Sequence, residues 1–424
     1  MKLLLLSLGS RGDMDPFLAV GERFAAAGWE VVCAMPEQFG KLVAAAGFRF
    51  HPLDRRFYAL IENSDVQNFM GQRGSWWQRG RQLWRLYQES KDIQRQLLRE
   101  QHAIMEVEQP DRILFHPKCM YPVLWHHRHP GRAATLLPVP GLLHPLYEHP
   151  PIVMSTKNYG RFANKLLNRL AGYGRAKAMA DTLPEVAAHF PKIAIKGNAL
   201  ERYSVERITS IYTVSPHLFA PPAHWSAHAH VVGYYARRES TTYTPPAALV
   251  AFLERHPKVL FVTFGSMVNA DPAGTTQTLL TLLRKHEIPT LINTFSGGLQ
   301  RIDNAPDHIC FTQSVPYTWI LPKVHAAIHH GGSGTTHMAT RSGCPSLIVP
   351  HIFDQYYWNW VVQQRGLGPA GLPIKQLTPN RLESKLLELW HSAVYKPNAM
   401  RLATAMQTET NSEELIELVR DGLR

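Results

Sequence analysis

The fold class of this chain is indicated by its opening residues, Leu3-Leu4-Leu5-Leu6-Ser7-Leu8-Gly9-Ser10-Arg11-Gly12-Asp13. The run from Leu3 to Leu8 shows no alternation, which is typical of a parallel strand buried on both faces. A glycine turn follows, and we expect Pro16 to open a helix whose apolar residues recur as far as Gly28. Glu30 to Met35 predicts the next strand. This strand–turn–helix–strand unit predicts a doubly wound α/β domain.

The same pattern restarts in the second half of the chain, where Val259 to Phe264 forms an apolar run before Gly265-Ser266. Further strands are predicted at 290–293, 309–311, 326–329 and 346–349. We therefore expect two Rossmann-like domains that face each other across a cleft. The first domain is predicted at 1–220 and the second at 247–405, and a linker marked by prolines at 221–246 joins them. A last helix within 406–424 is expected to pack back on the first domain. Residues 116–150, rich in proline and histidine, predict irregular loops, and 208–214 the last strand of the first domain.

The composition of the 424 residues is that of a globular protein with an excess of positive charge. Lys and Arg number 45 against 33 Asp and Glu, and this excess suits phosphates, anionic lipid or nucleic acid. No recognised nucleic-acid motif is present, so we expect no nucleic-acid partner. The four cysteines lie far apart, which argues against a disulfide framework or a cysteine zinc site. Because no apolar run approaches the roughly 18 residues of a membrane span, we expect a cytoplasmic protein.

The densest signal for chemistry is a glycine-rich stretch, His329-His330-Gly331-Gly332-Ser333-Gly334-Thr335-Thr336. A turn of this kind between a strand and a helix lets backbone N–H groups point at a phosphate. Ser333, Gly334 and Thr335 would be the first residues of that helix. His330 could donate to a diphosphate oxygen, whereas His329 is interpreted as a strand-end residue. A flexible loop with two incidental histidines is the alternative.

The residues around this stretch resemble the donor-binding signature of the UDP-glycosyltransferase superfamily, inverting enzymes with two Rossmann domains (GT-B type). The resemblance runs from Ser314-Val315-Pro316-Tyr317 through Gly343-Cys344-Pro345 to Asp354-Gln355, a pair that follows His330 by 24 positions. It implies these donor-binding residues: Ser10, Arg11, Gly12, Ser266, Val315, His330, Gly332, Ser333, Gly334, Thr335, Asp354 and Gln355. Plant members carry Trp and Glu where this chain has Ser314 and Met338, so UDP and TDP both remain open as the nucleotide.

The N-terminal turn resembles that of the bacterial antibiotic and sterol glycosyltransferases, in which the residue matching Asp13 is the general base. The chemistry needs such a group, because an attacking hydroxyl must lose its proton to a carboxylate within hydrogen-bond reach. The alternative is that Asp13 is a helix N-cap ahead of Pro16, and both roles are compatible. Arg11 either approaches the diphosphate or lies at the surface.

A stretch rich in Trp and Arg, residues 73–87, leaves three interpretations open: a packed helix, a wall of the acceptor site, or a surface that touches anionic membrane. Trp76 and Trp84 are the acceptor-binding candidates. Residues 161–177, with Phe162 and Leu166 among their apolar side chains, could extend a membrane surface.

The resemblance implies a metal-independent hexosyltransferase that uses a nucleoside diphosphate sugar and an apolar acceptor, with no cofactor. The histidine-rich segment His126-His127-Arg128-His129 is interpreted as a loop rather than a metal site. Peripheral membrane contact is a further expectation; the oligomeric state is unknown. Two alternatives remain: a catalytically silent partner protein of a glycosyltransferase, and a nucleotide-sugar epimerase of related fold.

Overall fold

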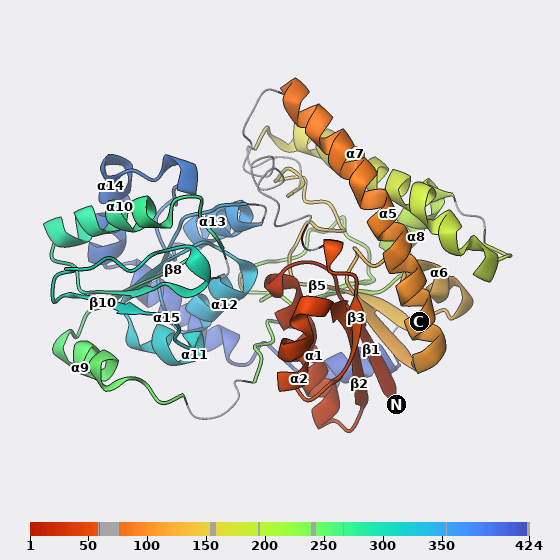
Figure 1. The fold of residues 1–424 in the computed structure, drawn as a ribbon, viewed down its shortest axis with the longest axis horizontal. Helices are drawn as coiled ribbons and strands as arrows, with labels where there is room; N and C mark the ends of the chain where they lie inside the picture. Colours follow the sequence, from red (N-terminus) through yellow and green to blue (C-terminus); the bar gives the residue numbers. More distant parts are fainter. Residues whose placement is uncertain are drawn as a thin grey trace. The chain divides into compact units, whose positions relative to one another are not determined.

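The computed structural model describes residues 1–57, 59, 76–152, 158–193, 196–238, 243–265, 267–352 and 354–421. The chain forms two compact units (Figure 1). Unit 1 comprises Met1–Glu239 together with Thr410–Arg424, and unit 2 comprises Ser240–Glu409. Each unit contains its own parallel sheet, so the prediction of two α/β domains is confirmed.

Unit 1 is built on a seven-stranded sheet in the order β3-β2-β1-β4-β5-β6-β7, in which all neighbouring strands are parallel. The strands are β1 (Lys2–Leu6), β2 (Glu30–Pro36), β3 (Arg49–Leu53), β4 (Arg112–Phe115), β5 (Ala133–Leu137), β6 (Ser210–Tyr212) and β7 (Ala229–Val231). Its helices are α1 (Arg11–Ala26), α2 (Gly40–Ala45), α5 (Trp76–Glu108), α6 (Tyr121–Arg128), α7 (Arg161–Thr182), α8 (Gly197–Glu206) and α16 (Ser412–Arg420).

The central strand β1 divides the apolar core of unit 1 into two halves. Leu3 and Leu5 pack in one cluster with side chains of α1 and α16, whereas Leu4 and Leu6 pack in another with side chains of α5 and α6. Because successive strand residues point to opposite faces, a continuous apolar run is what a sheet covered by helices on both sides requires.

Three sequence predictions in unit 1 are wrong. Residues 116–150 contain helix α6 and the buried strand β5, and β7 rather than β6 is the last strand, inside the expected linker. The flanking prolines and histidines obscure these short elements, and β7 is half-buried and only three residues long. Pro16 does not open a helix either: α1 begins at Arg11, and Pro16 is its sixth residue.

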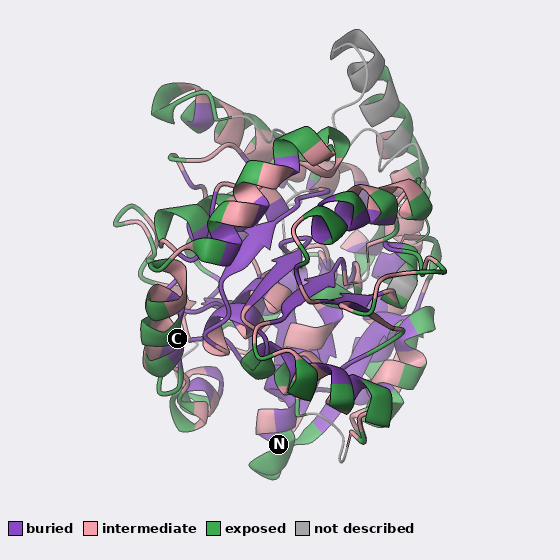
Figure 2. Cartoon of the chain, turned by 90° about the vertical axis from the view of Figure 1, so that its left-hand side faces the viewer, coloured by how far each residue is buried: buried purple, intermediate pink, exposed green. Residues whose placement is uncertain are grey.

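Unit 2 has a five-stranded parallel sheet in the order β10-β9-β8-β11-β12. Its strands are β8 (Leu260–Thr263), β9 (Thr290–Asn293), β10 (Ile309–Thr312), β11 (Ala326–His329) and β12 (Ser346–Ile348). Its helices are α9 (Ala247–Arg255), α10 (Pro272–Lys285), α11 (Tyr317–Ile320), α12 (Ser333–Arg341), α13 (Gln355–Gln364), α14 (Pro379–His391) and α15 (Tyr395–Met406). Figure 2 shows the buried strands and the exposed outer faces of the helices.

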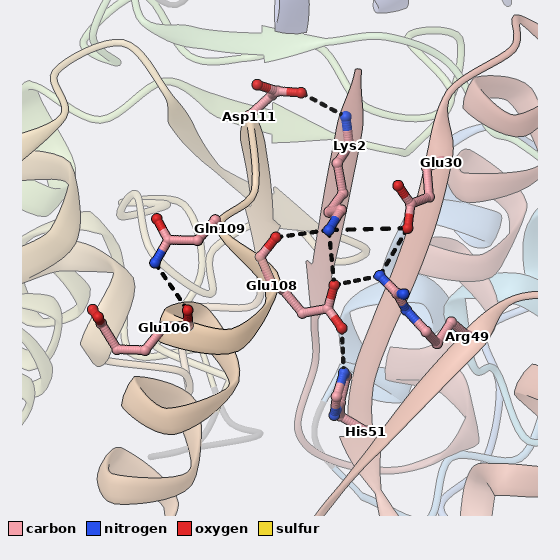
Figure 3. A network of polar contacts seen from close by, with 8 residues as sticks. All are labelled: Lys2, Glu30, Arg49, His51, Glu106, Glu108, Gln109 and Asp111. Carbon is pink, nitrogen blue, oxygen red and sulfur yellow. Dashed lines mark hydrogen bonds and ion pairs between the residues drawn. The ribbon is translucent and has the colours of Figure 1, made fainter.

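A polar network fixes the end of α5 to the amino edge of the unit 1 sheet (Figure 3). The carboxylate of Glu108, only 4% exposed, accepts from Lys2 Nζ on β1 at 3.2 Å and contacts Arg49 on β3. His51 Nε2 lies 2.6 Å from its other oxygen. Although burial opposes the charge of Glu108, hydrogen bonds from His51 and Lys2 lower its pKa. This network lies at the edge of the sheet opposite to the turn that follows β1.

Candidate active site

The turn that follows β1 meets the segment that follows β4 at the carboxyl edge of the unit 1 sheet, which is where α/β folds place their ligands. Asp13 is the third residue of α1, and its Oδ2 accepts hydrogen bonds from Ser10 N at 2.7 Å and Ser10 Oγ at 3.1 Å. Its Oδ1 lies 3.2 Å from both Lys118 Nζ and His116 Nε2. The N-cap of α1 is therefore Ser10, and Asp13 completes a capping box instead of being the cap itself.

The surroundings of Asp13 keep its carboxylate ionised. Burial by itself would raise its pKa, but Lys118, His116 and the Ser10 N–H together lower the pKa below the ordinary value. His116 is fully buried, and this burial lowers the pKa of its imidazole. Its Nδ1 accepts from the Lys118 N–H at 3.2 Å, so the neutral ring carries its hydrogen on Nε2, toward Asp13.

His116 and Lys118 were missed by the sequence reasoning. A signal was available in the apolar run from Ile113 to Phe115, which forms β4, because both residues directly follow it at the edge where the Asp13 turn also lies. Gly9 makes room for the group. It has a φ of 136°, and a Cβ there would lie 2.2 Å from Asp13 Oδ2 and 2.6 Å from Lys118 Nζ. A side chain at position 9 would therefore displace Asp13 or Lys118.

The other donor candidates of unit 1 lie at the start of α1. Arg11 is exposed, and its Nε donates to Asp15 Oδ2 at 3.2 Å, one helical turn away. Gly12 is also exposed and follows it in the first turn of the helix. Arg11 therefore lies at the surface of unit 1, where its guanidinium is paired with Asp15.

In unit 2, helix α12 begins directly after the turn that follows β11. Gly332 is its N-cap, and Ser333, Gly334 and Thr335 are its first three, half-buried residues. The first N–H groups of an α-helix point away from its body and carry the positive end of its dipole. Gly331 has a φ of 86°, and a Cβ there would lie 2.5 Å from Ile348. The turn therefore needs glycine to bring the helix start against β12.

His330 lies in a cradle formed by two glycines. A Cβ on Gly265 would lie 2.7 Å from His330 Cε1, and one on Gly332 would lie 2.5 Å from its Nε2. The ring is 7% exposed, and its Nδ1 has no hydrogen-bond partner within the described part of the chain. Burial, together with His329 and His351, holds the pKa of His330 well below its ordinary value, so the imidazole is neutral. Ser266, next to Gly265, lies outside the described residues.

The remaining donor candidates of unit 2 lie in the turns before α11 and α13. The side chain of Val315 is buried in the core, so a ligand can reach only its backbone. Asp354 is the N-cap residue of α13. Gln355 Oε1 accepts from the backbone N–H groups of His351 at 2.7 Å and Ile352 at 3.1 Å. Gln355 thus shapes the turn before α13, and its amide NH₂ is the part that could donate to a sugar.

Of the acceptor candidates, Trp84 does not line the cavity found in unit 1. Trp84 is 59% exposed on α5, with its ring 6.1 Å from that of Tyr87, and the side chain of Trp76 lies outside the described residues. This cavity, of about 180 Å³, lies between α7 and residues 141–152. Its lining includes Leu143, Tyr147, Lys165, Arg169 and Arg175.

The histidine-rich segment belongs to helix α6, not to a loop as predicted. His126 Nδ1 lies 2.8 Å from Tyr203 Oη, and the ring of His127 stacks on Tyr203. Among the residues that the structure describes, no group of three or more His, Cys, Asp or Glu side chains could hold a metal ion. Nor does any helix in this part of the chain have the length and apolar character needed to cross a bilayer.

Comparisons with known families and structures agree with this architecture. The family model "Glycosyltransferase family 28 N-terminal domain" matches residues 3–109, and "Erythromycin biosynthesis protein CIII-like, C-terminal domain" matches residues 284–421. Over the whole chain, the glycosyltransferase of kitacinnamycin has a TM-score of 0.72 at 15% identity, covering 100% of this chain and 99% of that one. CalG4, the calicheamicin glycosyltransferase, has a TM-score of 0.65 at 17% identity, covering 99% and 97%. The chain therefore has the GT-B fold.

Similar proteins extend the comparison. Sterol 3-beta-glucosyltransferase UGT80A2 of Arabidopsis thaliana is 28% identical over 420 residues, covering 96% of this chain and 63% of that protein. The sterol 3-beta-glucosyltransferase of Eremothecium gossypii is 26% identical, covering 91% and 31%. This chain thus spans less than two thirds of the length of these relatives. The matches confirm the resemblance to the UDP-glycosyltransferase superfamily of GT-B type.

Proposed function

We propose that this protein is an inverting, metal-independent glycosyltransferase that transfers a hexose from a nucleoside diphosphate sugar to a hydroxyl of an apolar acceptor. The observation that carries the proposal is Asp13, an ionised carboxylate held at the carboxyl edge of a parallel sheet by Ser10, His116 and Lys118. The similarity to sterol 3-beta-glucosyltransferases favours a glucosyl donor and a sterol-like acceptor.

The proposed reaction is a single displacement. The acceptor oxygen attacks the anomeric carbon from the face opposite to the diphosphate, and its proton passes to Asp13 as the new bond forms. A lowered pKa makes Asp13 a weak base in the free protein. An acceptor that excludes water and separates Lys118 from Asp13 would raise the basicity of the carboxylate.

The leaving group is a nucleoside diphosphate, on which negative charge accumulates. The first N–H groups of α12 and the imidazole of His330 are donors suited to that charge. Because the His330 ring is neutral, it offers an N–H hydrogen bond rather than a positive charge. Val315 would contact the nucleobase through its backbone, and Asp354 and Gln355 the sugar hydroxyls.

The test is an assay of product formation with a set of nucleoside diphosphate sugars, including UDP and TDP forms, and a sterol acceptor. We expect glycoside product of inverted anomeric configuration and activity that survives EDTA. Conversion of the donor into an isomeric sugar nucleotide would instead identify an epimerase. Donor binding without turnover of any acceptor would identify a silent partner protein, and strict dependence on a divalent cation would contradict the metal-independent site.

A further inference from the structure

Helix α7 presents a row of apolar side chains to solvent. Phe162 is 88% exposed, Leu166 54%, Leu170 50% and Tyr173 63%. At 3.6 residues per turn, their spacing places all four within one sector of the helix surface. We name these four residues the α7 stripe. Exposed large apolar side chains are common singly, but a continuous row marks a surface that meets an apolar partner.

The charge on α7 specifies the kind of partner. Residues 161–177 contain five cations, Arg161, Lys165, Arg169, Arg175 and Lys177, and no Asp or Glu. Arg161, Arg175 and Lys177 pair with carboxylates of Glu148, Glu201 and Asp181. Lys165 and Arg169, by contrast, make no ion pair within the described part of the chain, and both precede a residue of the stripe. Helical geometry places these two cations along one border of the α7 stripe.

We infer that the α7 stripe docks unit 1 on the surface of an anionic lipid bilayer. An apolar row bordered by Lys and Arg is the pattern of a helix that lies in the membrane interface, with its apolar face in the acyl boundary and its cations at the headgroups. The side of α7 that bears Asn164, Ala176 and Met179 is buried, so the helix already has a partner there and the stripe remains for another.

The same helix connects this surface to the cavity of unit 1. Lys165 and Arg169 line the cavity as well as bordering the stripe, and Asn168 and Ala171 line it from the neighbouring sector of α7. Docking would therefore bring the cavity to the lipid surface, where an apolar acceptor is dissolved. This consequence rests on the proposed function, whereas the docking itself does not.

The experiment is co-sedimentation of the full chain with vesicles of phosphatidylcholine alone and of phosphatidylcholine with phosphatidylserine. We expect binding to the vesicles that contain phosphatidylserine, weakened by added salt. The double variant Phe162→Ser, Leu166→Ser should bind at least about tenfold more weakly, because it removes much of the apolar row. The variant Lys165→Glu, Arg169→Glu should lose a similar factor, because each cation near the surface contributes to binding.

Two matched controls distinguish binding through the α7 stripe from nonspecific apolar binding and from nonspecific electrostatic binding. Val107→Ser changes an exposed apolar residue of α5 and should leave binding unchanged. Lys41→Glu with Arg55→Glu makes the same change in net charge at two exposed positions of unit 1 and should have a much smaller effect. The melting temperature of each variant is measured alongside, and Phe162→Ser alone repeats the test if the double variant fails to fold.

The inference is overturned if the wild type does not sediment with anionic vesicles, if neutral vesicles bind it equally, or if the stripe variants bind like the wild type. A loss of binding in the control charge variant equal to that of Lys165→Glu, Arg169→Glu would also overturn it. Vesicle binding is measured without turnover, so these outcomes can be interpreted even if the proposed transferase reaction is not observed.

Discussion

At the scale of single residues, the two candidate sites hold their key side chains in opposite charge states: Asp13 is ionised and His330 is neutral. Asp13 is half-buried yet kept ionised, because Lys118, His116 and Ser10 offset the cost of burial. His330 is buried and kept neutral, because burial and the two neighbouring histidines His329 and His351 disfavour its charged form. Pairs of groups whose environments push their pKa values apart are typical of catalytic sites.

The first prediction concerns Asp13→Asn. An amide can keep the hydrogen bonds from Ser10 but cannot accept the acceptor's proton, so transfer should fall by about 10²–10⁴-fold. Donor binding, measured by calorimetry with the nucleoside diphosphate, should be unchanged. Asp15→Asn, on the same helix and paired with Arg11, is the matched control and should retain nearly full activity. Transfer at the wild-type rate in Asp13→Asn would remove this residue from the base role.

The second prediction concerns His330→Ala. Loss of a hydrogen bond to a charged group costs about 1.5–3 kcal/mol, so nucleoside diphosphate affinity should fall by about 10- to 150-fold. The cradle of Gly265 and Gly332 should tolerate the smaller side chain. His330→Gln, which retains a donor, should restore part of the affinity. Equal affinity in wild type and His330→Ala would show that the imidazole does not contact the diphosphate.

At the scale of elements, the start of α12 and its surroundings concentrate neutral histidines in unit 2. Burial lowers the pKa of His329 to about 3, and those of His337 and His351 to about 4. His337 Nδ1 lies 2.7 Å from the Ser333 carbonyl, and His351 Nε2 lies 2.8 Å from Asn269 Oδ1. Their ordinary value is 6.5, so unfolding lets each ring take up a proton at mildly acidic pH.

The third prediction follows from that difference. Below about pH 6.5 the unfolded state binds more protons than the folded state, so the free energy of unfolding of unit 2 should fall as the pH is lowered from 6.5 toward 4. Each such histidine contributes a slope of about 1.4 kcal/mol per pH unit. Urea titrations across this range measure the slope. His337→Gln should lower the pH slope of the free energy of unfolding by the contribution of one histidine, whereas exposed His391→Gln should leave the slope unchanged. A free energy of unfolding that does not depend on pH would contradict the burial of these rings.

At the scale of the whole molecule, the elements that the sequence predicted best are those whose signal is local. The strands at 290–293 and 326–329 have their predicted bounds, and α12 begins at Ser333 as expected. Helix α6 and strand β5 were missed because short elements among prolines gain their stability from tertiary burial, not from local pattern.

In the candidate site, too, the residues with a local sequence signal were predicted and those that depend on tertiary contacts were not. Asp13 and His330 were found because each lies in a motif of fixed spacing. His116 and Lys118 were not, because they meet Asp13 only through the pairing of β1 with β4, about 100 residues apart in sequence. The structural role of Gln355 in the turn before α13 was also beyond the sequence, since it depends on backbone N–H groups that point at its side chain.

The last prediction concerns the path of the chain, which ends in unit 1 after completing unit 2. On α16, Leu415 and Val419 are buried in the cluster that contains Leu3 and Leu5 of β1. Arg112 Nε also donates to the Val419 carbonyl at 3.0 Å. Helix α16 is therefore part of the core of unit 1, although residues 240–409 separate it from the rest in sequence.

Leu415→Ala should consequently destabilise unit 1 and leave unit 2 intact. Replacing a fully buried leucine by alanine costs about 2–5 kcal/mol, and the cavity would open beside β1. Hydrogen exchange should therefore accelerate in peptides that cover β1 and β2, while those that cover β8 and β11 keep the wild-type rate. Glu417→Ala, an exposed change on the same helix, is the control and should alter neither. Faster exchange at β8 with no change at β1 would mean that α16 stabilises the other unit.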